Sequence, residues 1–134
     1  MPHIIIEFSS NLEVAIDIAS LAEAMHENAA SLDSLPTGGI RTRCVARHIY
    51  RIADGHPDNG FISVLVRIAR GRSDEEKKII GDSLFTTLIQ HVDFVFKHRP
   101  LSLALEIQEI NPDTRWKQSN IREYMQERHT RSGD

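Results

Sequence analysis

The chain has 134 residues, 40% hydrophobic and 26% charged, with a formal net charge of −3, an isoelectric point near 6.1 and one cysteine, Cys44. This composition is that of an average globular protein, and it excludes a strongly basic nucleic-acid binder and a secreted scaffold held by internal disulfides. Because no apolar run approaches the about 20 residues that span a bilayer and no signal-peptide pattern is present, we expect one cytoplasmic domain over residues 1–134.

The N-terminal stretch predicts a buried strand followed by a helix. Ile4-Ile5-Ile6 is β-branched and apolar, as buried strands are. The helix that follows can begin at Asn11, Asp17 or Ser20, and it ends before Leu35-Pro36, because a residue that precedes proline disfavours the α region. Apolar residues recur there at spacings of three and four, which is one helical face: Val14, Ile18, Leu21, Met25, Ala29 and Leu32.

The next segment predicts two strands joined by a loop. Ile40 to Ile52 is strand-like, and its Arg41 and Arg43 point to the same face because they are two residues apart. Residues 53–60 contain Asp-Gly, Asn-Gly and a proline, which indicates a loop. Phe61 to Ile68 is again rich in β-branched residues, so it is expected to be a strand.

The second half of the chain repeats this order. Ser73 and Glu76 have the spacing of a capping box at the start of a helix that runs to about His98. Leu101 to Gln108 alternates apolar and polar residues, which predicts a half-buried strand.

A turn and a short helix close the chain. The turn is expected at residues 111–113, the helix is capped by Ser119 or Asn120, and the polar residues 129–134 are expected to fray. Each half of the chain is then a β-α-β unit, and a long crossover of this kind joins parallel strands. The prediction is an α+β fold with one four-stranded sheet and two helices on one face. The other face carries apolar strand residues, which predicts an oligomer that covers it.

The residue that stands out chemically is Pro2. If Met1 is removed, Pro2 becomes an N-terminal secondary amine, and burial or nearby cations would bring its pKa below the ordinary 7.7–8.0 of an α-amine. Arg41 follows a Gly-Gly turn and Arg72 lies at a helix N-terminus, so both are candidates to bind carboxylates. A neutral amine beside several arginines suits a small acid with two or three negative charges.

Other kinds of site find less support. The seven histidines show no metal-ligand spacing, so we predict no metal site, and Cys44 on a strand fits a core residue better than a nucleophile. Gly38-Gly39 and Gly71 lack the lysine of a phosphate-binding loop.

Several motifs in order give the chain a family resemblance. They are Pro2-His3, Gly39-Ile40-Arg41-Thr42-Arg43, Ala53-Asp54-Gly55, Gly71-Arg72-Ser73, Leu105-Glu106-Ile107-Gln108-Glu109 and Lys117-Gln118-Ser119-Asn120. With them the chain resembles the 5-carboxymethyl-2-hydroxymuconate isomerases of the tautomerase superfamily from Pro2 to about Tyr124, and the tail after Glu127 extends beyond the usual end of that family.

This resemblance implies a cofactor-free isomerase that assembles as a cytoplasmic homotrimer. The implied reaction is a 1,3-proton shift on 5-carboxymethyl-2-hydroxymuconate in homoprotocatechuate (4-hydroxyphenylacetate) catabolism, with Pro2 as the general base and acid. Arg41 and Arg72 would bind carboxylates, and the further candidates for substrate binding are Arg43, Trp116 and Lys117.

Two alternatives stay open. The superfamily also contains other tautomerases, dehalogenases and decarboxylases that use the same proline, and a dehalogenase would need a group that activates water, for which Glu7 and Glu106 are the candidates. The other alternative is a non-enzymatic assembly protein. It gains support if Met1 is retained, because the nitrogen of Pro2 is then an amide without basicity.

Overall fold

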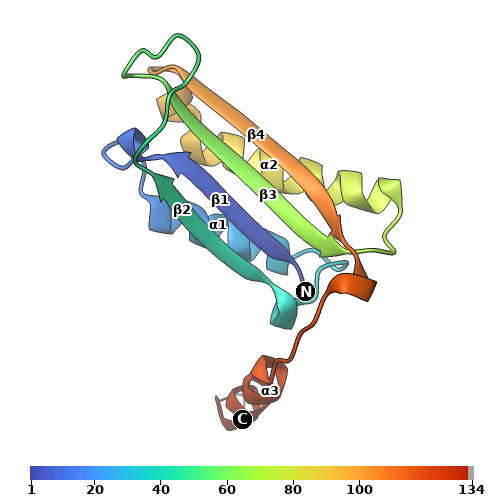
Figure 1. Ribbon diagram of the computed structural model, residues 1–134. Helices are drawn as coiled ribbons and strands as arrows, with labels where there is room; N and C mark the ends of the chain where they lie inside the picture. Colours follow the sequence, from blue (N-terminus) through green and yellow to red (C-terminus); the bar gives the residue numbers. More distant parts are fainter. Residues whose placement is uncertain (133–134) are drawn as a thin grey trace.

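A computed structural model describes residues 1–132 of the chain as one sheet of four strands with two long helices against it (Figure 1). The strands are β1 (His3–Ser9), β2 (Arg41–Arg47), β3 (Gly60–Ala69) and β4 (Leu101–Ile110). The α-helices are α1 (Ile18–Ala30), α2 (Asp74–Phe96) and α3 (Ile121–Ser132), and three short 3-10 turns are η1 (Ser10–Leu12), η2 (Thr37–Gly39) and η3 (Pro112–Thr114).

The sheet has the strand order β2-β1-β3-β4, which confirms the predicted pair of β-α-β units. Within each unit the strands are parallel, β1 with β2 and β3 with β4, and the two units meet along the antiparallel pair of β1 and β3. The register aligns His3 with Arg41 on one side and with Arg67 on the other. The start of β1 therefore lies beside the start of β2 and the end of β3.

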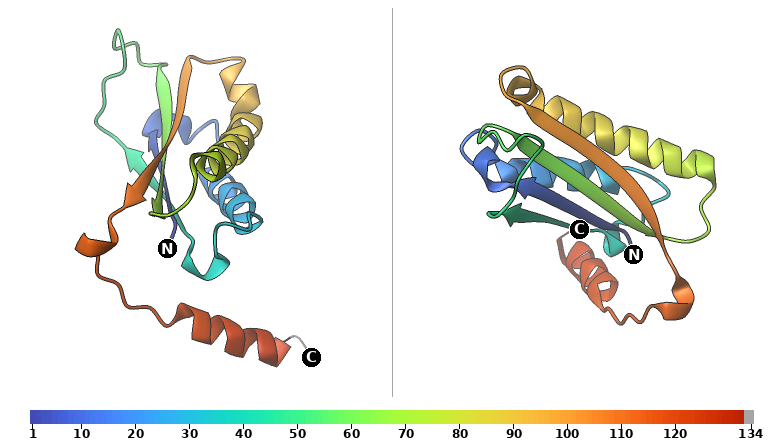
Figure 2. Two further views of the ribbon diagram at one scale, coloured as in Figure 1. Left: turned by 90° about the vertical axis from the view of Figure 1, so that its right-hand side faces the viewer. Right: turned by 45° about the horizontal axis from the view of Figure 1, so that its top comes forward.

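Both long helices cover the same face of the sheet, as predicted (Figure 2, left). The core between these layers holds alternate strand residues, such as Ile4 and Ile6, and the inward stripe of each helix, such as Leu21 and Leu84, all fully buried. The helix-to-helix contact also has a polar link: Asn28 of α1 donates to Thr87 of α2 over 2.9 Å and accepts from Ser83 over 3.0 Å.

The helix α1 is shorter than the predicted apolar stripe, so the first and last residues of that stripe lie outside it. Asp17 is the N-cap and accepts a hydrogen bond from the backbone N–H of Ser20 over 3.1 Å, which decides among the three predicted starts. Val14 therefore precedes the helix and is 90% exposed, so its placement on the inward face was wrong. Leu32 follows the last helical residue, yet it still packs against the core.

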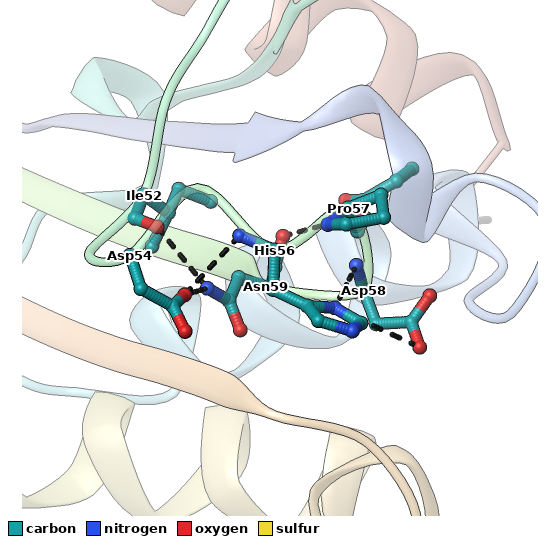
Figure 3. A network of polar contacts seen from close by, with 7 residues as sticks. Ile52, Asp54, His56, Pro57, Asp58 and Asn59 are labelled. Carbon is teal, nitrogen blue, oxygen red and sulfur yellow. Dashed lines mark hydrogen bonds and ion pairs between the residues drawn. The ribbon is translucent and has the colours of Figure 1, made fainter.

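The second strand is shorter than predicted, because it ends at Arg47 and not at Ile52. Its only partner in the sheet is β1, and the last pair of that ladder joins Ser9 to Arg47, so the residues beyond have no strand to bond. They form a loop ordered by Asn59, whose side-chain NH₂ donates to Ile52 O over 3.1 Å and to Asp54 over 2.9 Å (Figure 3).

The C-terminal helix is longer than predicted. We expected residues 129–134 to fray, but α3 continues to Ser132, and residues 133–134 lie outside the described part of the chain. An ion pair one turn apart, Arg131 to Glu127 at 2.6 Å, and basic side chains in the last turn favour this extension. Apart from η2, α3 has few contacts with the rest of the chain and stands away from the sheet (Figures 1 and 2).

The sheet face opposite the helices carries a mixture of apolar and charged side chains. Ile5 and Leu65 pair across β1 and β3, and both are only partly buried. Arg43 lies beside Ile5 on the same face, as the two-residue spacing from Arg41 predicted. No other element of residues 1–132 packs across this face. That a partner subunit covers it therefore stays a prediction.

Among the described helices, α2 alone is long and apolar enough to cross a membrane by length and composition. Five of its apolar residues form one buried stripe in the core, Ile80, Leu84, Leu88, Val92 and Val95, whereas Ile79, Ile89, Phe94 and Phe96 are exposed. A buried stripe of this kind is typical of a core helix, so length and composition are only weak evidence that α2 crosses a membrane.

Candidate active site

Pro2 lies buried directly before β1, at the end of the sheet where the N-terminus lies (Figure 1). The η2 turn lies against it and also contacts α3. Its carbonyl accepts a hydrogen bond from the backbone N–H of Arg41 over 2.9 Å, so the ladder of β1 and β2 fixes its position. Gly39 lies so close that an added Cβ would be 3.2 Å from Pro2 Cδ and from Met1 Cα. The glycine thus allows the turn to approach the N-terminus.

Arg41 and Arg72 are held at this end of the sheet by backbone carbonyls. Arg41 Nη1 donates to Gly39 O over 2.8 Å, which keeps its side chain near the turn that touches Pro2. Arg72 donates to Ser34 O through Nε and Nη2 and to Ala69 O through Nη1, so it joins the loop after α1 to the end of β3. Both guanidinium groups keep further N–H donors for a ligand.

A cavity of about 400 Å³ lies beside the N-terminus. Its walls come from Met1, from the glycines of η2 and from the segment that leads into α3, and the residues are Met1, Gly38, Gly39, Lys117, Gln118, Ser119, Arg122 and Glu123. The charged side chains are two cations, Lys117 and Arg122, and one carboxylate, Glu123. Such a wall favours an anionic ligand of small size.

The N-terminal amine is less basic here than in a free peptide. With Met1 in place, its pKa is lowered from the ordinary 8.0 to about 6, first by burial and then by the positive charges of Arg115, Lys117, Arg72 and Arg122. The next residue, His3, has its pKa lowered by burial and then mainly by Arg43 and Arg67. An amine at this place is therefore largely neutral near pH 7, as a general base must be.

The remaining predicted site residues lie at different distances from the N-terminus. Lys117 lines the cavity, and its positive charge helps to lower the pKa of the N-terminal amine. Arg43 is exposed on the open sheet face, where it contacts His3 Nδ1 at 3.1 Å. Trp116 is 87% exposed and is not part of the cavity wall.

A larger hollow of about 680 Å³ lies between α2 and β4. Its walls carry charges of both signs, including Asp74, Lys77 and Asp82, and Lys77 is already paired with Asp74 at 3.2 Å. It contains neither the N-terminal amine nor an arginine. The smaller cavity therefore has the chemistry of a site, and the larger hollow does not.

Comparison with known proteins agrees with this geometry. The family model described as 5-carboxymethyl-2-hydroxymuconate isomerase matches residues 2–125. The chain belongs to this family. It is 31% identical over 121 residues to the 5-carboxymethyl-2-hydroxymuconate Delta-isomerase of Escherichia coli, a match that covers 90% of this chain and 96% of the relative.

Two solved structures share the fold closely. A 5-carboxymethyl-2-hydroxymuconate isomerase from Deinococcus radiodurans R1 has a TM-score of 0.86 and 33% identity, over 92% of this chain and 93% of that one. A 5-carboxymethyl-2-hydroxymuconate delta-isomerase with 24% identity has a TM-score of 0.85, over 93% of each chain. The resemblance read from the motifs is thus confirmed, and the protein is an isomerase by family.

The structure adds two residues of this isomerase that the sequence did not single out. The positive charges of Arg115 and Arg122 lower the pKa of the N-terminal amine, and Arg122 also lines the cavity. Both lie beyond β4, where no strand or helix periodicity connects them with Pro2. The one available signal was the density of cations between residues 115 and 122, beside the motif that begins at Lys117.

Proposed function

We propose that the protein isomerises 5-carboxymethyl-2-hydroxymuconate without a cofactor, with Pro2 as the base and acid. The observation that carries this proposal is a buried proline directly after Met1, which itself lines a cavity that contains cations, in a chain of the matching isomerase family. The names of the relatives point to the same substrate.

The reaction moves one proton from the 2-hydroxyl oxygen to carbon 5, the two ends of a five-atom conjugated system, so counted along these atoms it is a 1,5-shift and not the 1,3-shift that the resemblance implied. The neutral amine of Pro2 takes the proton of the 2-hydroxyl group, and the charge of the resulting dienolate spreads from the oxygen to carbon 5. The protonated amine then returns a proton to carbon 5, which leaves a 2-oxo group and a double bond between carbons 3 and 4. Proton and charge balance without a redox partner.

Arg41 and Arg72 would supply the electrostatic part of this reaction. Each is held by backbone carbonyls near the N-terminus and keeps donors for carboxylates. A fixed positive charge beside a forming dienolate stabilises it without reorganisation during the reaction. Arg72 is also one of the cations that lower the pKa of the N-terminal amine, so one side chain would serve both substrate binding and the neutral state of the base.

The proposal requires that Met1 is removed. With Met1 attached, the nitrogen of Pro2 is an amide and the cavity faces the amine of Met1. After removal, the basic nitrogen lies one residue deeper, at a position that is already buried. Burial is the first cause of the lowered pKa at Met1, so it should act at least as strongly on Pro2.

We propose a cytoplasmic homotrimer, in line with the family resemblance. The open sheet face supports an assembly because Ile5 and Leu65 lie there without a cover among residues 1–132. A solved structure described as a symmetric trimer of fused 4-OT shares the fold at a TM-score of 0.59 and 15% identity, over 88% of this chain and 92% of that one.

The test is the loss of dienol absorbance of 5-carboxymethyl-2-hydroxymuconate with protein whose N-terminus is verified by intact mass. Pro2→Ala should reduce kcat/KM by about 10²-fold or more, because a primary amine without the ring replaces the rigid secondary amine and a positioned general base contributes about 10²–10⁴-fold, with the assembly size unchanged. Full activity of this variant would refute the role of Pro2. No turnover by folded protein that lacks Met1 would refute the substrate assignment.

A further inference from the structure

Arg122 stands out because it faces the cavity from an element outside the sheet. It lies in the first turn of α3, over η2, where an added Cβ on Gly38 would come within 2.7 Å of Arg122 Cγ. The side chain therefore packs against a glycine that leaves room for it. A cation from the C-terminal segment is brought to the N-terminus in this way.

The guanidinium of Arg122 is also unlike those of Arg41 and Arg72. Within residues 1–132 it makes no hydrogen bond and no ion pair, whereas Arg41 donates two side-chain hydrogen bonds and Arg72 donates three. Its planar fork is thus free to bind a carboxylate with two parallel hydrogen bonds. Glu123 follows it in the cavity wall, but the two are not paired.

The substrate carries one more carboxylate than a plain hydroxymuconate. Its chain ends in two carboxylates, and the carboxymethyl arm at carbon 5 adds a third. Arg41 is anchored to the backbone beside Pro2, and Arg72 is anchored at the end of β3, from where its charge acts on the N-terminal amine, so both suit groups near the reacting atoms. The arm needs a partner further out, and the cavity wall offers Arg122, supported by Lys117 and by the Ser119 hydroxyl.

We propose that Arg122 binds the carboxylate of the carboxymethyl arm and so makes the enzyme prefer a tricarboxylate to a dicarboxylate. This assignment rests on the proposed function of the same site. It gives α3 a role in specificity, because the helix and the segment before it hold Arg122 against η2.

The kinetic test compares two substrates. Arg122→Gln should lower kcat/KM for 5-carboxymethyl-2-hydroxymuconate by about 10- to 100-fold, the range of a lost charge-assisted contact. For 2-hydroxymuconate, which lacks the arm, the change should stay within about threefold, since only loss of positive charge remains. Arg122→Lys keeps the positive charge without the planar fork. Its kcat/KM for 5-carboxymethyl-2-hydroxymuconate should lie between those of the wild type and Arg122→Gln.

Arg131→Gln is the matched control, because it removes the same charge from the same helix at a residue paired with Glu127 and outside the cavity wall. It should leave both substrates unaffected. Equal losses on both substrates in Arg122→Gln would overturn the assignment, because a merely structural or general electrostatic role would not discriminate between them. No loss on either substrate would also overturn it.

A binding measurement separates this inference from the reaction. Titration calorimetry with propane-1,2,3-tricarboxylate and with glutarate, which lacks the middle carboxylate, needs no turnover. The wild type should bind the tricarboxylate more tightly, and Arg122→Gln should reduce that preference by about tenfold or more. If the wild type turns over neither substrate, the proposed function fails, while this preference still decides whether Arg122 recognises a third carboxylate.

Discussion

The pH dependence of the reaction tests whether the site lowers the pKa of the N-terminal amine enough to keep it neutral, and so able to accept a proton, near pH 7. With Met1 in place, the N-terminal amine has a pKa of about 6 in place of 8.0, and the causes are burial first, then Arg115, Lys117, Arg72 and Arg122. The same causes should lower the pKa of the Pro2 amine, one residue deeper, once Met1 is removed. A base works in its neutral form, so kcat/KM should rise with pH through the amine pKa and level off above it. The midpoint should lie well below pH 8.0.

The size of the effect follows from these values. An amine of pKa about 6 is about nine-tenths neutral at pH 7, whereas one of pKa 8.0 is about one-tenth neutral. Arg115→Gln removes the largest single charge effect, so it should move the midpoint upward. The lowering from 8.0 to about 6 is shared among five causes with burial the largest, so the move should be less than about one pH unit.

The assay is kcat/KM for the dienol substrate from pH 4.5 to 9 at constant ionic strength, on protein that lacks Met1. Added salt should move the midpoint in the same direction as Arg115→Gln, because it screens the cations. Arg131→Gln should leave the profile in place. A wild-type midpoint at or above pH 8.0, or an unchanged midpoint in Arg115→Gln, would refute the electrostatic reasoning.

Two further predictions concern the core and the assembly. Leu84→Ala on the fully buried face of α2 should lower the free energy of unfolding by about 2–5 kcal/mol. Ile79→Ala, at a site that is 56% exposed, should change it by less than about 1 kcal/mol. Both values come from urea unfolding at one protomer concentration, and equal losses would contradict the burial pattern. Leu65→Asp places a charge on the open sheet face and should reduce the assembly size in light scattering, whereas Phe94→Asp on the outer side of α2, 57% exposed, should not. The reverse result would place the interface on α2.

Local patterns in the sequence were enough for most of the secondary structure and for the two β-α-β units, but not for the strand order or for the antiparallel pair of β1 and β3. The capping box of Ser73 and Glu76 is present as predicted, because it joins residues three apart and needs no distant partner. The alternation from Leu101 onward marks a strand because it reflects one covered face. Two long crossovers then require parallel pairs, and these are the pairs observed.

The sequence alone also determined the family and pointed to Pro2, Arg41 and Arg72, since these residues lie within ordered motifs. Tertiary structure decided what depends on a distant neighbour. β2 ends at Arg47 because its partner β1 ends at Ser9, which no pattern within residues 40–52 reveals. Arg115 and Arg122 reach the N-terminus because the segment after β4 turns back over η2, which places residues more than 110 positions apart at one cavity.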